Sequence, residues 1–299
     1  MLAQLLLAAA VFGGTWPAGK VAVEHVPPLV ASTARFGLAA VLLGGWVRLR
    51  RGRLPLPRRR DLPLVLALGA TGIAGYSVFF LVGLEKAPAA DGSILVPGLI
   101  PVVTTLLVWR LHGERPSSRV LAGLAVALVG LVVVVDPVGG FGSQRIEGDA
   151  ILLGGPVCWA LYSILGRVAV ARFDPVLATT YAVAVGTVML LPFSATGLHR
   201  LAGAPATAWL AILYLSPLAT VFGFVIFYEG VRVIGAARAS MTTLLVPVFG
   251  VLSSVVVLGE PLRVGVAIGG VVVLAGLWLV QRPARPAGGL AAEASSSQS

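Results

Sequence analysis

Long apolar runs, separated by short polar or Pro/Gly-rich connections, occupy most of the chain. A transmembrane helix needs roughly 17–25 mainly apolar residues to cross about 30 Å of hydrocarbon. Ten runs reach this length, at residues 2–23, 29–47, 62–84, 89–110, 119–136, 148–167, 176–196, 208–231, 235–258 and 262–281. Non-helical backbone cannot face lipid, so the connections 48–61, 136–148 and 196–207 are expected at or beyond the membrane surfaces. The pattern predicts an all-α integral membrane protein with ten transmembrane helices.

The composition supports a bilayer as the solvent of this chain. Of its 299 residues, 58% are hydrophobic and only 11% are charged, with a mean hydropathy of +0.97. Soluble domains carry about 25% charged residues, so a water-soluble fold is excluded. The single cysteine, Cys158, cannot form an intrachain disulfide or supply a thiolate cluster. Neither a metal site nor any other cofactor is predicted.

The positive charges are distributed unevenly between the two sides of the predicted membrane. If the N-terminus is cytoplasmic, sixteen of the 22 Lys and Arg fall on the inner side, and Arg35 lies within a span. The outer side carries five, which are Lys20, Lys86, Arg145, Arg200 and Arg263. This bias predicts a multi-pass protein of the plasma (inner) membrane with both termini in the cytoplasm. The basic connection 48–60 is expected to contact anionic lipid headgroups, and nucleic acid is not a predicted partner.

The two halves of the chain resemble each other. A shift of 147 residues pairs Phe12 with Trp159, Lys20 with Arg167, Pro28 with Pro175, Ser32 with Thr179 and Gly83 with Gly230. After one deletion, a shift of 146 pairs Pro101 with Pro247, Gly113 with Gly259, Glu114 with Glu260, Gly123 with Gly269 and Gly130 with Gly276. The ordered series predicts a first repeat over 1–136 and a second over 148–281. Residues 283–299, rich in Pro, Ala, Gly and Ser, are predicted to be a disordered cytoplasmic tail.

The repeat has a consequence for function. Five helices, an odd number, separate equivalent points, so the halves are predicted to insert as two inverted five-helix repeats. Many secondary transporters are built in this way, with the substrate site near the midplane between the repeats. We therefore predict a secondary transporter that moves a small metabolite by alternating access. The alternative is a membrane-embedded enzyme acting on lipid or peptide. However, no nucleophile with a histidine partner is visible within the spans, so no catalytic residue is predicted.

Several motifs resemble those of one transporter family. Residues 12–20, Phe-Gly-Gly-Thr-Trp-Pro-Ala-Gly-Lys, resemble the first-helix W-G-x-x-[FW]-x-x-x-K pattern of EamA-type proteins in the drug/metabolite transporter superfamily, with Phe12 where Trp is usual. Residues 111–115 and 258–261 resemble the L-G-E ends of the fourth and ninth helices, and Ala-Ser at 239–240 before Pro-Val at 247–248 resembles the ninth-helix pattern. The likeness covers nearly all of residues 1–281. It implies ten helices, a central cavity, and export or uptake of metabolites by alternating access.

Arg35 is the most informative single candidate for substrate binding. It lies six residues into the second span, or about 9 Å along a helix. An arginine at the centre of a span costs at least about 2.5–3.5 kcal/mol, so it is expected either to face a cavity or to have a structural role by snorkelling or ion pairing. Lys20 and Asp91 come from the same outer half, which makes a cluster of three charges feasible. This cluster would favour a substrate with a carboxylate, such as an amino-acid-like compound, and we expect export.

Aromatic residues near the middle of spans are further candidates for the cavity lining. They could stack on a planar or apolar substrate, although most aromatic residues of membrane bundles pack against neighbours or lipid. The candidates are Trp16, Tyr76, Phe79, Trp159 and Tyr162.

Five other residues are assigned to coupling or to the scaffold. Glu229 is a candidate for carrying a coupling proton, with an ion pair to Arg232 as the alternative. Glu114 and Glu260 each follow a glycine at a helix end, where a carboxylate can accept from exposed backbone N–H groups and stabilise the following helix. With Pro101 and Pro247, these two acids are predicted to be repeated structural motifs.

Overall fold

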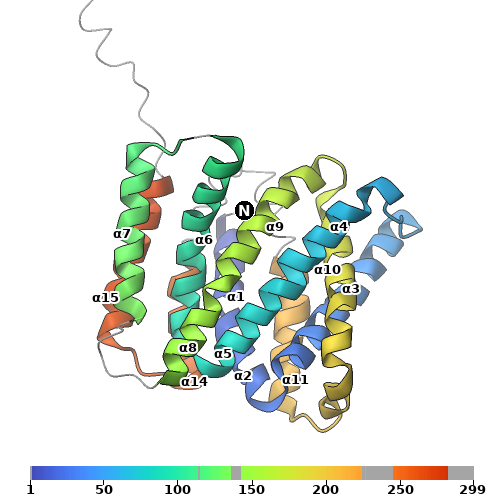
Figure 1. Cartoon of the computed structure of the whole chain (residues 1–299). Coiled ribbons are helices and arrows are strands. Elements are labelled where there is room, and N and C mark those ends of the chain that lie inside the picture. The colour runs from blue at the N-terminus through green and yellow to red at the C-terminus, as the bar shows by residue number, and fades with distance from the viewer. Residues whose placement is uncertain (1, 114, 136–142, 224–225, 227–244, 282–299) are drawn as a thin grey trace, which may run out of the picture.

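A computed structural model describes residues 2–113, 115–135, 143–223, 226 and 245–281. All regular secondary structure in these residues is helical, and the helices form one bundle (Figure 1). The beginning of α1 and the end of α15 lie at the same end of this bundle.

The first half contains ten helical elements joined by short connections. Two of them, η2 and η3, are π-helical, and η1 is a 3₁₀ turn. The elements are α1 (Leu2–Gly13), α2 (Thr15–His25), α3 (Pro28–Arg51), η1 (Arg59–Asp61), α4 (Leu62–Leu68), η2 (Gly69–Gly75), η3 (Val78–Val82), α5 (Gly83–Lys86), α6 (Ala89–His112) and, at its end, α7 (Ser118–Val135).

The described part of the second half follows a similar order. Its elements are α8 (Ser143–Leu152), α9 (Gly154–Val170), α10 (Pro175–Ser194), the 3₁₀ helix η4 (Ala195–Leu201), α11 (Ala206–Leu213), the π-helix η5 (Tyr214–Phe222), α14 (Val246–Leu258) and α15 (Val264–Gln281).

Helical segments occur at the position of each of the ten predicted spans. Within the described residues, six helices are long and apolar enough to cross a membrane, and four more are apolar but shorter. The predicted connections need correction. Helix α3 continues through Arg48 to Arg51, because arginines in the last turn interact favourably with the helix dipole. Residues 143–148 and 196–201, predicted as connections, belong to α8 and η4.

Glycine and aspartate define several helix ends. Gly113 and Gly259, the two glycines of the repeated motif, end α6 and α14 with φ of +71° and +67°. This left-handed conformation is the usual one just after a helix and favours glycine. Asp174 begins α10 by accepting hydrogen bonds from the backbone nitrogens of Val176 and Leu177, with Pro175 in the first turn.

Helices α7 and α15 pack antiparallel through glycines. A Cβ at Gly276 would lie 2.6 Å from the carbonyl oxygen of Gly123, and one at Gly130 would lie 2.7 Å from that of Gly269. A Cβ at Gly276 would also lie 2.5 Å from the backbone nitrogen of Ala127. Small residues at such positions let two membrane helices approach backbone to backbone. Gly123 and Gly269, which are equivalent in the internal repeat, both lie in this interface.

Helices α3 and α10 form a second antiparallel pair in the other part of the bundle. The Thr33 hydroxyl donates to the Ser194 hydroxyl at 2.9 Å, and Gly37 faces Thr187. Two clusters of buried apolar side chains lie beside this pair. One joins α2, α5 and η5, and the other joins α3, α9 and α10.

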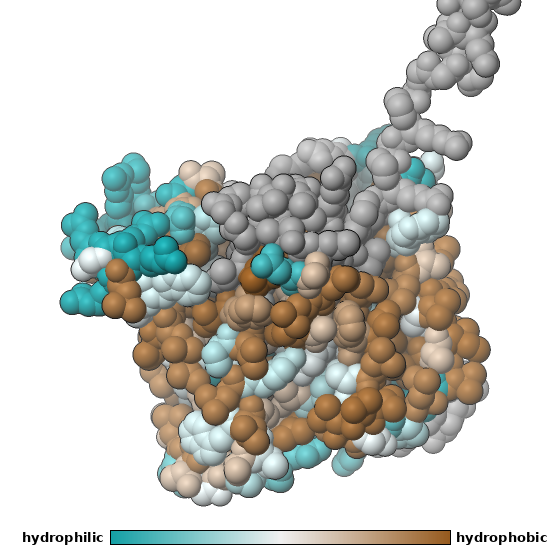
Figure 2. All heavy atoms as spheres, turned by 180° about the vertical axis from the view of Figure 1, so that it is seen from behind, coloured by the Kyte–Doolittle hydropathy of each residue, from teal (hydrophilic) through white to brown (hydrophobic). Residues whose placement is uncertain are grey.

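The surface of the bundle is a belt of apolar side chains between two polar ends (Figure 2). Val41, Leu49, Val129 and Val256 are between 61% and 88% exposed, which a bilayer but not water would accommodate. The end where α1 begins carries the exposed arginines of residues 48–60, and we call it the basic end.

The α7–α15 contact yields a prediction about stability. Gly276→Leu should lower the free energy of unfolding by about 1–3 kcal/mol or prevent assembly, because its side chain would collide with the α7 backbone. The measurement is thermal unfolding in detergent, followed by size-exclusion chromatography. Gly44→Leu is the matched control, since nothing lies within 4 Å of a Cβ at Gly44. Equal melting temperatures for the two variants would contradict the importance of this contact.

Candidate functional site

Five aromatic rings form a continuous series through the interior, which we call the aromatic series. Trp16 of α2 meets Phe80 of η3 edge-on, with 5.0 Å between ring centroids. Tyr76 stacks on Phe80 at 5.7 Å and an interplanar angle of 15°. Tyr76 also lies 5.4 Å from Trp159, which lies 5.6 Å from Tyr162. Rings at these separations attract one another, and the series connects the two halves of the chain.

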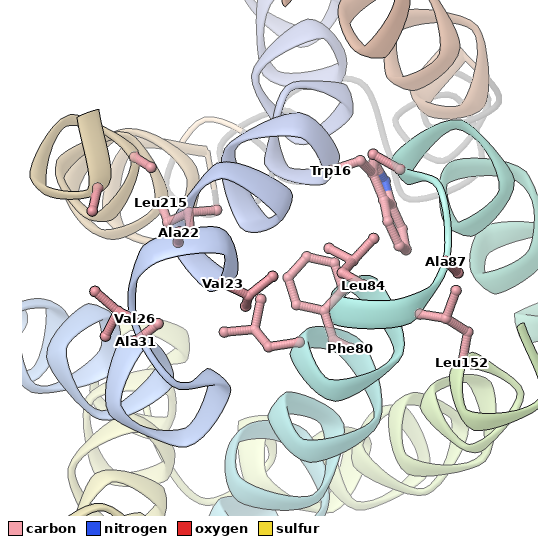
Figure 3. Close-up of a cluster of buried hydrophobic side chains, with 14 of the residues drawn as sticks. Trp16, Ala22, Val23, Val26, Ala31, Phe80, Leu84, Ala87, Leu152 and Leu215 are labelled. Atoms are coloured by element: carbon pink, nitrogen blue, oxygen red, sulfur yellow. The ribbon is translucent and has the colours of Figure 1, made fainter. Parts of the chain in front are cut away.

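The aromatic series contains four of the five predicted aromatic candidates. Phe79 is the exception, because its ring packs against Gly154, where no Cβ could be accommodated. Phe80 takes its place, and Figure 3 shows its ring between Val23 and Leu84. The sequence contained a signal for Phe80 that was missed, since residues four apart share a helix face and Phe80 follows Tyr76 by four.

Arg35 is buried in α3 with 8% of its surface exposed. Its Cζ lies 4.7 Å from the ring centroid of Phe36 and 5.9 Å from that of Phe80, distances typical of cation–π contacts. One terminal nitrogen donates to the Thr220 hydroxyl at 3.4 Å. Among the described residues, its Nε has no hydrogen-bond partner and no acid forms an ion pair with it.

Two buried hydroxyls accompany Arg35 and were not predicted from the sequence. Ser32 of α3 and Ser216 of η5 are fully buried, and neither Oγ has a hydrogen-bond partner in the described part of the chain. Thr220, on the same helix as Ser216, donates to the carbonyl oxygen of Leu215 at 2.8 Å. Ser32 could have been predicted from its position three residues before Arg35, because residues with this spacing lie on one helix face.

Lys20 does not join Arg35, contrary to the cluster of three charges that the sequence suggested. Its Nζ donates to the carbonyl oxygens of Leu84 at 2.6 Å and Ala87 at 3.0 Å. These carbonyls belong to the end of α5, where backbone oxygens lack helical partners and an ammonium group is favourable. Lys20 therefore connects α2 to the end of α5.

Asp91, the third member of the suggested cluster, also lies elsewhere. Its carboxylate is fully buried, accepts a 2.8 Å hydrogen bond from Arg145 Nε, and is paired with Arg263 on its other oxygen. Arg145 was predicted in a connection on the outer side, but it is a buried residue of α8. A buried carboxylate requires such partners, because leaving it alone in a low dielectric is very costly.

A second buried acid lies beside this pair. Asp149 of α8 is 2% exposed, and its carboxylate lies 3.8 Å from Arg145 Nε. Neither of its oxygens has a hydrogen-bond partner among the residues that the structure describes. We call Asp91, Arg145, Asp149 and Arg263 the ionic cluster, and the end of the bundle where it lies the ionic end.

Glu260 also lies at the ionic end. Its two carboxylate oxygens accept from the backbone nitrogens of Ala89 and Ala90 at 2.8 and 3.0 Å, the first residues of α6. The sequence predicted a carboxylate at a helix N-terminus, but assigned it to the helix that follows Glu260. The chain folds so that the N-terminus of α6, from the other half, meets this acid instead. Glu260 also lines a cavity of about 480 Å³ with Lys20, Glu24 and His25.

The basic end carries two ion pairs of its own. Arg172 donates to Asp61 at 3.1 Å, connecting the end of α9 to the start of α4. Arg51 lies 3.6 Å from Asp174, connecting the end of α3 to the start of α10. Both partners of the Arg51–Asp174 pair are exposed, so this pair contributes little to stability, whereas the carboxylate of Asp61 is buried.

The remaining predicted residues separate into two groups. Pro101 lies inside α6, and Pro247 lies in the first turn of α14. Glu114, Glu229 and the predicted tail 283–299 lie outside the described residues. In the residues that the structure does describe, no group of three or more His, Cys, Asp or Glu is arranged to hold a metal ion.

Comparison with known proteins places this architecture among transporters. A sequence model described as "EamA-like transporter family" matches residues 1–136 and 146–282. The chain is 30% identical to the uncharacterized transporter YyaM of Bacillus subtilis, over 91% of each chain. It is also 30% identical to a probable terminal-alkyne amino-acid exporter of Streptantibioticus cattleyicolor, over 93% of this chain and 92% of that one.

The fold has a counterpart among solved structures. One crystal structure superposes with a TM-score of 0.62 and 22% identity, covering 92% of this chain and 94% of the other. The apolar helices identify a multi-pass membrane protein, and the likeness to named transporters over nearly the whole chain indicates a general transport function. The family match covers both halves of the chain, and the chain therefore belongs to the EamA-like transporter family.

Proposed function

We propose that the chain is a secondary transporter that exports a small organic metabolite, amino-acid-like or of similar size, across the plasma membrane. The proposed mechanism is alternating access between two inverted five-helix repeats. The two repeats would together contain ten membrane spans, which are the six long helices and the four shorter apolar ones. The observation that carries the proposal is the pairing of α7 with α15, its equivalent in the other half.

The α7–α15 contact has the symmetry that inverted repeats require. Gly123 is equivalent in sequence to Gly269, and Gly130 to Gly276. In the structure Gly123 contacts Gly276, which is the equivalent of Gly130. Gly130 in turn contacts Gly269, which is the equivalent of Gly123. Such reciprocal contacts are the mark of a twofold axis. Because the two helices run antiparallel, this axis is perpendicular to them, which favours opposite insertion of the two halves.

Other contacts come in equivalent pairs as well. Helix α3 packs against its equivalent α10, and the α3–η5 contact corresponds to the α10–η2 contact. The α6–α9 contact likewise corresponds to the contacts of α14 with α1 and α2. The two π-helices η2 and η5 also occupy equivalent positions in the repeats. Interrupted helices at equivalent positions of two halves are typical of transporter binding sites.

The ionic cluster fits the role of a closed gate. Asp91 begins α6 in the first repeat, Arg263 precedes α15 in the second, and Arg145 lies on α8, which leads into the second repeat. Their ion pairs therefore join the two halves at one end of the interior. Since most Lys and Arg of the described residues lie toward the other end, the positive-inside rule supports an orientation with the ionic end outside and both termini in the cytoplasm. Breaking these pairs would accompany opening to the outside.

The basic end has the properties expected for contact with lipid. The exposed arginines at 48, 50, 51, 53 and 58–60 would each gain about 1 kcal/mol near an anionic membrane surface. A groove of about 570 Å³ along α3 lies beside them, lined by Val41, Trp46, Leu49 and Arg50 among others. Anionic phospholipids are therefore proposed as partners of this end.

Transport in proteoliposomes tests the proposal directly. Purified protein should move at least one labelled metabolite from a panel of amino acids, amphipathic cations, nucleosides and sugar derivatives, with and without a pH gradient. Arg35→Gln should reduce this transport at least about tenfold while expression stays normal, because a buried charge facing the interior is lost. Normal transport by Arg35→Gln would remove Arg35 from the site. If no compound crosses, the transporter proposal fails and the enzyme alternative gains support.

The gate can be tested with Cys158, the one cysteine of the chain, which lies midway along the continuous α8–α9 segment. Asp91→Asn removes the charge that holds Arg145 and Arg263, so the outer end should open more often. Labelling of Cys158 by an impermeant maleimide added outside cells should become about tenfold faster. Glu147→Gln is the control, because it removes an exposed pair with Lys86. Equal labelling rates for wild type and Asp91→Asn would argue against a gate.

Coupling to protons is a separate prediction. If Glu229 carries the coupling proton, Glu229→Gln should abolish the effect of a pH gradient on uptake but leave substrate exchange without a gradient. The measurement is uptake in proteoliposomes at equal and unequal pH. Unchanged dependence on the gradient would leave Glu229 only the structural pairing with Arg232.

A further inference from the structure

Three polar groups on the contacting helices α3 and η5 are buried without partners in the described part of the chain. They are the hydroxyls of Ser32 and Ser216 and the Nε of Arg35. Buried polar groups of proteins nearly always have a hydrogen-bond partner, and hydrocarbon supplies no water to replace one. Serine in a helix usually donates to the carbonyl four residues earlier, as Ser163 does to Trp159 at 2.8 Å. Ser32 and Ser216 do not form this bond to a carbonyl four residues earlier.

The geometry brings these groups to one interface. Helix α3 and the α11–η5 segment both begin at the ionic end and run toward the basic end, so they are parallel (Figure 1). Arg35 meets Thr220 at the interface between them. Ser32 lies one turn before Arg35, and Ser216 lies about one turn before Thr220. Both serines are therefore displaced from the Arg35–Thr220 contact in the same direction. We call these four residues the polar set.

The scaffold does not require the polar set. The equivalent interface in the other half joins α10 to η2, and a shift of 147 places Ala182 where Arg35 would be. Gly69 and Ile73 stand at the equivalents of Ser216 and Thr220. There the helices pack through apolar contacts, with Gly69 against Gly186. Features of the scaffold recur in both halves, such as Gly113 and Gly259, whereas of the polar set only Ser32 has a polar equivalent, Thr179, and that hydroxyl already donates to the carbonyl oxygen of Pro175 at 2.9 Å.

The chemistry of the polar set selects an anionic oxygen group. A guanidinium and hydroxyl donors bind a carboxylate strongly in a low dielectric. No acid of the described residues neutralises Arg35, so an anion is the partner its site lacks. Beside it, the rings of Phe36 and Phe80 are apolar, and Phe80 continues into the aromatic series. A ligand that satisfies both surfaces has a carboxylate at one end and an apolar body at the other.

We infer that Ser32, Arg35 and Ser216 bind the substrate carboxylate, that Thr220 positions the Arg35 guanidinium by accepting its hydrogen bond, and that the aromatic series receives the substrate's apolar body. The inference rests on the proposed transport function and narrows its substrate to carboxylates with an apolar body. Amino acids with apolar or unsaturated side chains belong to this class. The amino-acid exporter among the relatives is named for such a substrate.

Matched acid and amide probes test the subsite. Full-length protein in proteoliposomes is loaded with apolar amino acids, among them leucine, phenylalanine and an amino acid with a terminal alkyne, and with the primary amide of each. An amide keeps the shape of the acid but loses its negative charge. A site built around an arginine should therefore transport the best acid at least about tenfold faster than its amide, a ratio that corresponds to about 1.4 kcal/mol.

Variants separate the subsite from a purely structural role. Arg35→Gln should lose the preference for the acid, and Arg35→Lys should keep part of it, because the charge remains but the planar donor geometry is lost. Ser32→Ala combined with Ser216→Ala should raise the KM for the acid about threefold or more and leave the KM for the amide unchanged. Ser254→Ala is the control, since this buried serine already donates to the carbonyl oxygen of Gly250 at 2.8 Å.

The outcomes distinguish the subsite from the transport function itself. If the wild type transports acids and amides equally, or if Arg35→Gln keeps the preference for the acid, the carboxylate subsite is wrong while transport stands. If the wild type transports other classes of the panel but none of these acids, the subsite is likewise wrong. If nothing is transported, the proposed function fails and the subsite fails with it. A folded Arg35→Gln protein is verified by its elution as a monodisperse peak.

Discussion

The structure depends on one constraint, namely that hydrocarbon offers no hydrogen bonds to the polar groups of the chain. Most polar side chains inside the bundle satisfy this constraint locally. Thr71 and Thr187 donate to carbonyl oxygens one turn earlier, and Lys20 donates to the free carbonyls at the end of α5. The ionic cluster satisfies it through residues far apart in sequence, since Asp91 pairs with Arg145 of the segment between the repeats and with Arg263 of the second repeat. Polar groups thus determine which helix ends meet.

A few buried polar side chains do not satisfy this constraint. Where a polar side chain inside the bundle lacks a partner, the fold has not been selected for local stability at that point. Ser32, Arg35 and Ser216 form one such place, and Asp149 forms another. The first lies along the aromatic series and the second at the ionic end. Among the described residues, most buried groups without a hydrogen-bond partner therefore lie along the proposed route of the substrate or at its proposed gate, and Thr104 of α6 is an exception.

The sequence predicted how far along a membrane span a residue lies better than it predicted which neighbouring helix its side chain faces. Hydropathy located the helical segments, and the repeated glycines at 113 and 259 were recognised as helix ends because local geometry favours glycine there. The partners of Asp91 could not be predicted in this way. Arg145 and Arg263 share its depth, as Lys20 does, but only the packing of α6 against its neighbours decides which cation reaches the carboxylate. The helix stabilised by Glu260 was misassigned for the same reason, because two chain segments far apart in sequence meet at that end.

The position of Glu260 has a consequence for biosynthesis. Ribosomes deliver the chain from its N-terminus, so α6 enters the membrane long before Glu260 has been made. Until then, the amides of Ala89 and Ala90 lack the acceptor seen in the finished fold, and Asp91 lacks Arg263. The nascent first half must keep this helix end hydrated at the membrane surface. Maturation of that half is therefore completed only when the connection between α14 and α15 emerges.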